Sequence, residues 1–254
     1  MFDELQGKAV LVTGSSTGIG AAAAKGFARL GATVAVHYNS SAAAAEAVVA
    51  AIAAAGGKAV LLHGDVTDSA VARRVVDEAA ERCGRLDILV NNAGGMVERR
   101  LIADSDDAVL DRVLDLNVRS VIAATAAAIP HFCRQGKGNI VNVSSIAARN
   151  GGSAGAGIYA AAKGFVSTLT HGLAKEHAKD NIRVNAVSPG VILTPFHERY
   201  STEAQLETAR QTIPMGRFAT AEECVGTVLF LATDALSSYV TGQVIEVNGG
   251  QLMP

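Results

Sequence analysis

Tyr159 and Lys163 lie four residues apart in the run GIYAAAKGF. On an α-helix this spacing puts a phenol and an ammonium group on one face. A tyrosine exchanges protons with a carbonyl or an alcohol at neutral pH only if its pKa falls from ~10 towards ~7, which requires about 4 kcal/mol. An ammonium at ~4 Å in an effective dielectric of ~20 supplies roughly that much. Taken alone, however, the pair is best explained as chance on an amphipathic helix.

A glycine-rich segment near the N-terminus, VLVTGSSTGIG, predicts a second feature, a nucleotide-binding turn. It follows the apolar run KAVLV and precedes an alanine-rich stretch, so Gly14, Gly18 and Gly20 would turn the chain between a strand and a helix. Glycine lets the backbone approach a pyrophosphate, and the helix N-terminus offers free N–H groups and a partial positive charge. The spacing G-x-x-x-G-x-G differs from the commoner G-x-G-x-x-G, but the setting favours a dinucleotide cofactor.

The end of the next apolar run bears on which dinucleotide is used. An acidic residue there would bind the ribose hydroxyls of NAD and repel a 2′-phosphate. The chain instead reads His37-Tyr38-Asn39-Ser40-Ser41, with no carboxylate. Asn and Ser can donate hydrogen bonds to a phosphate, so we expect NADP(H) to be favoured. No Arg or Lys stands there, which leaves NAD(H) possible.

The elements that must position these residues alternate along the chain. Seven short runs rich in Val, Ile and Leu are typical of buried strands of a parallel sheet: KAVLVT, ATVAVHY, KAVLLHG, LDILVNN, GNIVNVSS, IRVNAVS and QVIEVNG. Helical stretches lie between them at about 19–31, 41–55, 68–83, 104–135 and 157–179. This order predicts an α/β fold, a single Rossmann-type doubly wound sheet domain over 1–254 with helices on both faces.

Further polar residues fall where two of these strands end. Ser144-Ser145 closes GNIVNV, and Asn91-Asn92-Ala93-Gly94 closes LDILV. The carboxyl ends of parallel strands are where α/β sheets bind ligands. Asn117 lies inside a long helical segment, where a buried amide needs partners.

These motifs together make the chain resemble the short-chain dehydrogenase/reductase family. TGSSTGIG, NNAG, Asn117, the second Ser of IVNVSS, YAAAK and SPGVILT occur in family order over essentially the whole chain. The resemblance implies that Tyr159 is the acid/base, that Lys163 lowers its pKa and holds the nicotinamide ribose, and that Ser145 binds the substrate oxygen. It also implies that Asn117 holds a water that relays protons to Lys163.

The resemblance also implies a set of cofactor contacts on the glycine turn, the strand ends and the loop after SPG. These positions are Gly14, Ser16, Thr17, Gly18, Ile19, Gly20, Tyr38, Asn39, Ser40, Asp65, Val66, Asn92, Ala93, Gly94, Tyr159, Lys163, Pro189, Gly190, Val191, Ile192 and Thr194.

Three alternatives stay open at this point. The loop between Ser145 and Tyr159 is longer than is usual in the family, so Ser144 or Ser153 could contact the substrate instead of Ser145. Gly151-Gly152-Ser153-Ala154-Gly155 also matches the G-x-S-x-G elbow of hydrolases, although no strand directly precedes it. A non-catalytic nucleotide-binding protein is the third alternative, disfavoured because all four catalytic positions are filled.

The substrate is less well defined than the reaction. The nearest likeness is to 3-oxoacyl-(acyl carrier protein) reductases, with sugar or polyol dehydrogenases as the alternative. Such reductases dock their acidic carrier on basic residues, but Gly136 and Asp180 stand where we would look, with Lys137 and Lys179 adjacent. Arg99-Arg100 could serve an anionic substrate, but we interpret it as a solvated loop. The polar segment 194–217 predicts a mobile substrate lid, with a surface helix pair as the alternative.

Composition narrows the remaining classes. The 254 residues carry a formal net charge of −2 without a basic stripe, so we expect no nucleic-acid partner. The N-terminal run MFDELQGK has no apolar signal, and we expect neither membrane insertion nor export. Three scattered cysteines show no metal spacing and suit a reducing cytoplasm. The C-terminal run YVTGQVIEVNGGQLMP resembles the family's assembly segment, which implies a homotetramer.

Overall fold

The computed structural model describes residues 3–253. Residues 1, 2 and 254, the ends of the predicted 1–254 domain, lie outside the described residues. One sheet of seven strands has the order β3-β2-β1-β4-β5-β6-β7, and every pairing is parallel. The strands are β1 (Ala9–Val12), β2 (Thr33–Tyr38), β3 (Lys58–His63), β4 (Ile88–Asn91), β5 (Gly138–Val143), β6 (Ile182–Pro189) and β7 (Val244–Val247).

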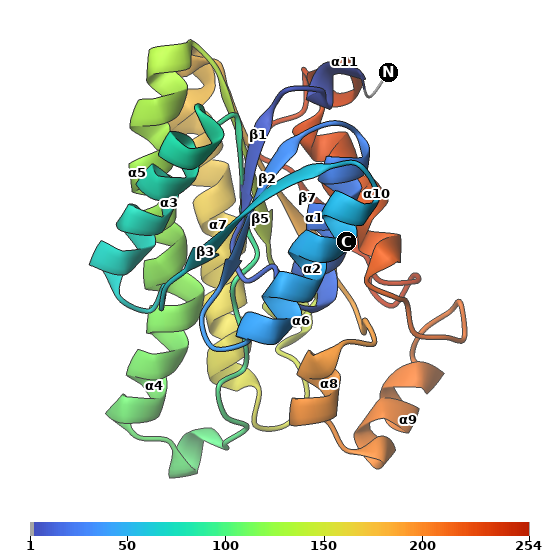
Figure 1. Ribbon diagram of the computed structural model, residues 1–254. Helices are drawn as coiled ribbons and strands as arrows, with labels where there is room; N and C mark the ends of the chain where they lie inside the picture. The colour runs from blue at the N-terminus through green and yellow to red at the C-terminus, as the bar shows by residue number, and fades with distance from the viewer. Residues whose placement is uncertain (1–2, 254) are drawn as a thin grey trace.

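Long helices cover both faces of this sheet (Figure 1). On one face lie α1 (Gly18–Arg29), α2 (Ala42–Ala54) and α10 (Glu222–Ala232). On the other lie α3 (Ser69–Cys83), α5 (Ser120–Gln135) and α7 (Gly157–His177). The predicted Rossmann-type fold is therefore confirmed, and each of the seven predicted strands is present.

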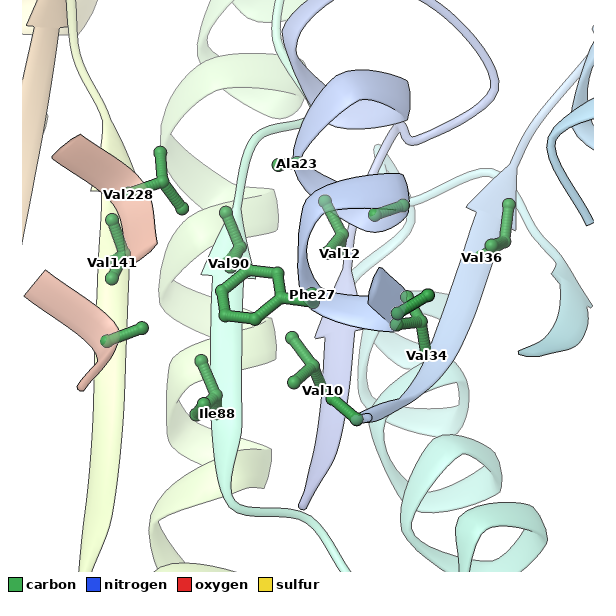
Figure 2. Packing of buried hydrophobic residues seen from close by; sticks show 14 of the residues in the cluster. Val10, Val12, Ala23, Phe27, Val34, Val36, Ile88, Val90, Val141 and Val228 are labelled. Atoms are coloured by element: carbon green, nitrogen blue, oxygen red, sulfur yellow. The ribbon is translucent and has the colours of Figure 1, made fainter. Parts of the chain in front are cut away.

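The core of the first face forms around Phe27 of α1, which is fully buried. Figure 2 shows its ring above Val10 and Val12 of β1 and beside Ile88 and Val90 of β4. The small residues of α1 let this helix lie close to the sheet and to α10, since a Cβ on Gly26 would lie 2.5 Å from Val225. Close packing of α1 holds the glycine turn that precedes it against the carboxyl edge of the sheet.

The predicted helix over 104–135 is interrupted. It consists of α4 (Asp107–Leu114), one π-helical turn (Asp115–Arg119) and α5. Its span Asp107–Gln135 is long and apolar enough to cross a membrane by length and composition alone. Half of the apolar window is buried, and α5 packs against α3. The length and composition of this span are therefore weak evidence for a membrane-spanning helix.

The sequence did not predict α10 or the short helices α6 (Ala147–Asn150) and α11 (Asp234–Ser237). The segment 194–217 contains α8 (Pro195–Tyr200) and α9 (Glu203–Gln211), which lie beyond the carboxyl ends of the strands (Figure 1). Short 3-10 turns span Asp3–Leu5, Ile102–Asp104 and Ala178–Asp180.

A chain of buried side chains braces that carboxyl edge. Asn91 at the end of β4 donates to Thr125 on α5 at 3.1 Å and to Asn142 on β5 at 2.9 Å. Asn142 in turn donates to Thr170 on α7 at 2.9 Å. The strand order reverses between β1 and β4, so the sheet offers its ligand crevice next to these braced ends.

Candidate active site

A cavity of about 960 Å³ opens along the carboxyl ends of the strands. It runs from the glycine turn after β1 to the helices α8 and α9. The predicted residues that line it are Gly14, Ser16, Thr17, Gly18, Ile19, Asn39, Ser40, Asp65, Val66, Asn92, Ala93, Gly94, Ser145, Tyr159, Lys163, Pro189, Gly190, Val191, Ile192 and Thr194. Three predicted residues, Gly20, Tyr38 and Asn117, do not line it.

The glycine turn has the geometry that a dinucleotide requires. Gly14 and Gly18 have φ values of +62° and +56°, a region that side chains disfavour. A Cβ on Gly14 would lie 2.9 Å from the Ala93 backbone. Gly20 supports the turn indirectly. The Asn92 Nδ2 donates to the carbonyls of Thr13 and Gly14, and a Cβ on Gly20 would lie 2.4 Å from this nitrogen.

His37 ties the glycine turn to the third strand. The Gly14 N–H donates to His37 Nδ1, and Nε2 lies 3.0 Å from the Gly64 carbonyl, so the ring is held as the neutral Nε2–H tautomer. Burial lowers the pKa of His37, which favours the same neutral form. No functional role for His37 was predicted from the sequence; its position at the end of β2, beside the ligand edge, was the available signal.

The far end of the cavity, beyond β2 and β3, is lined by Asn39, Ser40, Ser41 and Asp65. A hydrogen bond from Asn39 and two from Thr67 lower the pKa of Asp65 against the opposing effect of burial. No lysine or arginine lines this end within the described residues. Tyr38 points elsewhere and packs against His63, with ring centroids 5.0 Å apart.

Tyr159 and Ser145 meet at the other end. The Tyr159 ring lies 5.7 Å from that of Phe196 on α8, measured between centroids. Burial raises the pKa of Tyr159 to about 12, and a hydrogen bond with Ser145 acts in the opposite direction. This differs from the expected fall towards ~7, because desolvation of the phenolate dominates.

Lys163 is buried beneath the same site. Its Nζ lies 5.8 Å from the Tyr159 ring centroid and donates to the Val143 carbonyl at 2.8 Å. Burial lowers the pKa of Lys163 to about 8. The Lys163 charge does not offset the desolvation of the Tyr159 phenolate. A positive charge added beside Tyr159 would be needed to lower the tyrosine pKa.

The three candidate serines have different surroundings. Ser144 is buried and its hydroxyl bonds to the Lys163 carbonyl and to Ser167 on α7. Ser145 lines the cavity next to Tyr159. Ser153 accepts a hydrogen bond from Arg99 at 2.8 Å and follows α6 rather than a strand. This geometry favours Ser145 and gives no hydrolase elbow.

Asn117 lies at the centre of the π-helical turn and is fully buried. Its Nδ2 donates to the carbonyls of Gly95 and Val113, and its Oδ1 accepts from the Gly95 N–H. A Cβ on Gly94 would lie 2.9 Å from both Asn117 Oδ1 and Lys163 Nζ. Gly94 therefore keeps the space between the amide and the ammonium open.

These features fit a nicotinamide dinucleotide. The glycine turn offers a close backbone approach for the pyrophosphate, and the Lys163–Gly94–Asn117 group lies beside the Tyr159 phenol. The sequence did not single out several other lining residues of the substrate end, Met96, Asn150, Phe196, His197, Gln205 and Thr208, which belong to a loop and to α6, α8 and α9.

The sequence is similar to a known protein family and to named relatives over nearly the whole chain. The family described as "Enoyl-(Acyl carrier protein) reductase" matches residues 14–251. A 3-oxoacyl-[acyl-carrier-protein] reductase FabG from Thermotoga maritima is 41% identical over 246 residues, covering 97% of this chain and 98% of the relative. An L-rhamnose 1-dehydrogenase (NAD(P)(+)) from a Sphingomonas species is 39% identical over 248 residues, covering 97% and 96%.

A solved structure supports the same conclusion. The crystal structure of NADH-dependent reductase A1-R′ complexed with NAD superposes with a TM-score of 0.89 at 39% identity and covers 100% of both chains. The fold, the braced carboxyl edge and these full-length similarities show that the chain belongs to the short-chain dehydrogenase/reductase family of NAD(P)-dependent oxidoreductases.

Proposed function

We propose that the protein interconverts a carbonyl and a secondary alcohol, with Tyr159 as the proton donor or acceptor. The observation that carries this proposal is the meeting of Tyr159, Ser145 and Lys163 in one cavity beside the glycine turn. When bound, the nicotinamide cofactor supplies or accepts the hydride.

Side chains of the protein would bind the substrate and transfer the proton. The Ser145 hydroxyl holds the substrate oxygen, and the Tyr159 hydroxyl gives it a proton during reduction. The pKa of about 12 makes free Tyr159 a proton donor rather than a base at neutral pH. Alcohol oxidation needs the phenolate, so it depends on the added positive charge of the oxidised cofactor and on the Lys163 ammonium.

Lys163 and Asn117 would carry the replacement proton. Because the pKa of Lys163 is lowered to about 8, its ammonium gives up a proton more readily than an exposed lysine. The Gly94 gap between Lys163 Nζ and Asn117 Oδ1 connects the ammonium to the π-helical turn. We place the proton-relaying water implied by the family in this gap.

The adenosine end supports use of both cofactors, with a modest preference for NADP(H). Ser40 and Ser41 offer hydroxyl donors to a 2′-phosphate, but no cation neutralises it and the Asp65 carboxylate lies on the same wall. We therefore expect dissociation constants for NADPH and NADH within about tenfold of each other, a difference below about 1.4 kcal/mol.

Two substrate classes are proposed. The first is a 3-oxoacyl compound, following the family likeness. The second, a sugar or polyol, is favoured by the polar side chains of Asn150, Gln205 and Thr208 at the substrate end. Docking of an acidic carrier protein has less support, because the Lys137 ammonium is already paired with Asp234 at 2.9 Å. We assign the enzyme to the cytoplasm, where its three free cysteines would stay reduced.

The test is Tyr159→Phe, assayed with NADPH and NADH against β-keto esters and sugars. We expect turnover to fall by about 10²-fold or more, because proton transfer is lost, while calorimetric affinity for both cofactors stays within about twofold. Turnover close to that of the wild type would contradict the assignment. If the wild type bound neither cofactor, the proposed nicotinamide-dependent activity would be contradicted.

A further inference from the structure

Basic side chains, but no acidic ones, line the substrate end of the cavity among the described residues. Among the lining residues that the structure describes, the single acidic side chain is Asp65, at the adenosine end. The substrate end instead carries two basic side chains besides Lys163, those of Arg99 and His197. Its other polar groups are amides and hydroxyls, from Asn150, Ser153, Gln205, Thr208 and Thr212.

Arg99 is half-buried and bonded only to neutral groups. Its Nε donates to the Tyr200 carbonyl at 3.0 Å, and one terminal nitrogen donates to Ser153 Oγ and to the Ala154 carbonyl, both at 2.8 Å. The second terminal nitrogen makes no hydrogen bond among the described residues, and burial lowers the Arg99 pKa. The expected solvated loop is therefore incorrect for this residue.

Arg100, the next residue, differs from Arg99 in that it forms ion pairs. Arg100 pairs with Glu98 at 2.5 Å and with Asp106 at 3.5 Å, so its charge is neutralised within the chain. Arg99 forms no such ion pair with any described side chain. A partly buried cation without a counter-ion is unfavourable, and the free terminal nitrogen of Arg99 still has two N–H groups that can donate to a carboxylate.

The backbone before Arg99 is strained. Val97 has φ +63°, a left-handed conformation that β-branched residues rarely adopt. The Glu98 N–H donates to the Met96 carbonyl at 2.7 Å, which closes a tight turn between Met96, a lining residue, and Arg99. Strain of this kind concentrates at ligand sites, and here it turns the chain just before the unpaired cation.

His197 on α8 lines the same pocket. Its Nδ1 lies 3.0 Å from Ser201 Oγ. Burial lowers the His197 pKa, and the Arg99 charge lowers it further, so the ring is neutral at pH 7 and Arg99 remains the cation. A neutral imidazole can donate to a hydroxyl or an oxygen of the same ligand.

We propose that the substrate carries a carboxylate, which the free terminal nitrogen of Arg99 binds while the carbonyl or alcohol carbon of the substrate lies at Tyr159 and Ser145. The substrate class is a keto acid, or the corresponding hydroxy acid, with further hydroxyls for the amides of Asn150 and Gln205. This inference rests on the proposed oxidoreductase function and narrows its substrate.

The experiment compares each acid with a neutral counterpart. The pairs are acetoacetate with methyl acetoacetate, and gluconate with glucitol, assayed with the matching reduced or oxidised cofactor. We expect the acid to be favoured in kcat/KM by about tenfold or more in at least one pair. Arg99→Gln should lower kcat/KM for the acid by about 10- to 100-fold and for the neutral member by less than about threefold.

Arg100→Gln is the matched control, because it removes an adjacent, internally paired charge, and it should leave the preference unchanged. Arg99→Lys keeps the charge and should retain part of the preference. The acid-to-neutral ratio is the readout, since loss of the Tyr200 and Ser153 contacts through simple loosening would affect both members alike. Preference for the neutral member, or an acid preference unchanged in Arg99→Gln, would overturn the proposal.

Binding separates this proposal from the catalytic one. Calorimetry with Tyr159→Phe and saturating cofactor measures affinity for the same pairs without turnover, and it decides the outcome if no member is turned over. Stronger binding of the acid that is lost in the double variant with Arg99→Gln supports the carboxylate site even if Tyr159 is not the proton donor. A phosphate ester, glucose 6-phosphate beside glucose, tests the other common anion; its preference over gluconate would contradict a carboxylate.

Discussion

Lys163 lies at the proposed active site, where burial disfavours the charged form of its side chain. The lowering of its pKa from 10.5 to about 8 corresponds to about 3 kcal/mol by which burial disfavours the charged form. The side chain is 4% exposed, so solvent screens this effect little. The hydrogen bond to the Val143 carbonyl offsets part of it. The protein therefore holds a destabilising charge at the place where the proposed mechanism needs a proton.

We predict that Lys163→Met stabilises the cofactor-free protein by about 1 kcal/mol at pH 7. The change removes about 3 kcal/mol of desolvation and leaves the Val143 carbonyl unpaired, at about 1–3 kcal/mol. Wild-type Lys163 loses its proton near pH 8 when folded and near 10.5 when unfolded, so its destabilising effect fades across that range. Urea unfolding at pH 7 and pH 10 should show the variant's advantage and then its loss.

Lys25→Met is the control for this measurement, since Lys25 is exposed on α1 and should show little difference between the two pH values. A Lys163→Met protein that is less stable than the wild type at pH 7 would mean that the Val143 contact outweighs the buried charge. Turnover should be lost in either case.

The sequence motifs predicted Tyr159, Lys163 and Ser145 because spacing on one helix and position at a strand end are local properties. They did not predict the roles of His37 and Arg99. His37 matters because the fold brings it to Gly14 and Gly64, and Arg99 because the fold brings Ser153 and Tyr200 to it. Single residues whose partners lie far along the chain leave no pattern in the sequence.

At the scale of elements, the helices that cover the cavity are held less firmly than the layers of the sheet. Neither α8 nor α9 contains a buried residue. Phe196 on α8 lies against Tyr159, and α9 contributes Gln205, Leu206 and Thr208 to the cavity wall. This arrangement agrees with a cover over the substrate site; its movement stays a prediction.

The start of α9 offers a way to test that movement. The Gln205 N–H donates to Thr202 Oγ1 at 3.3 Å, and the Thr202 N–H donates to Gln205 Oε1 at 2.9 Å. We predict that Thr202→Ala, which costs about 1 kcal/mol of helix stability, raises KM by about 3- to 10-fold and leaves the melting temperature within about 1 °C. Hydrogen exchange should accelerate in α9 alone.

Asp68→Ala provides the comparison, because Asp68 caps α3, which packs against the sheet and beside α5. That change should lower global stability by about 1 kcal/mol with KM unaffected. If Thr202→Ala instead lowered the melting temperature and left KM unchanged, α8 and α9 would be an ordinary surface pair.

Element-level prediction succeeded where the apolar pattern was regular and failed where tertiary contacts decide. Runs of Val, Ile and Leu gave every strand. The apolar pattern over 104–135 did not reveal the π-helical turn, because that turn depends on Asn117 bonding to Gly95 in a distant loop. Helix α10 was missed because, after Glu222 and Glu223, the run CVGTVLFLA is almost continuously apolar and shows no clear helical period.

On the scale of the whole molecule, two of the surfaces with exposed apolar side chains are candidates for contacts between copies of the chain. Ile122 on α5 and Phe165 on α7 are 41% and 43% exposed on helices that cover the same face of the sheet. Tyr239, between α11 and β7, and Met253, after β7, are 102% and 81% exposed. Strand β7 is an edge strand that pairs with β6 alone. Two self-complementary surfaces of this kind suit a tetramer with three two-fold axes.

We predict that each surface can be broken separately. Phe165→Glu should disrupt the contact between long helices and Tyr239→Glu the contact at the C-terminal edge, because each buries an unpaired carboxylate. Light scattering should then give a tetramer for the wild type, a dimer for either single variant and a monomer for the double variant. Lys58→Glu on β3, at the opposite edge of the sheet, changes the charge by two units, more than either single variant, and should remain tetrameric. A monomeric wild type, or single variants that stay tetrameric, would mean that these apolar side chains serve another purpose. The stepwise result would place the two interfaces on the surfaces named here, since one shared interface would take both single variants directly to monomers.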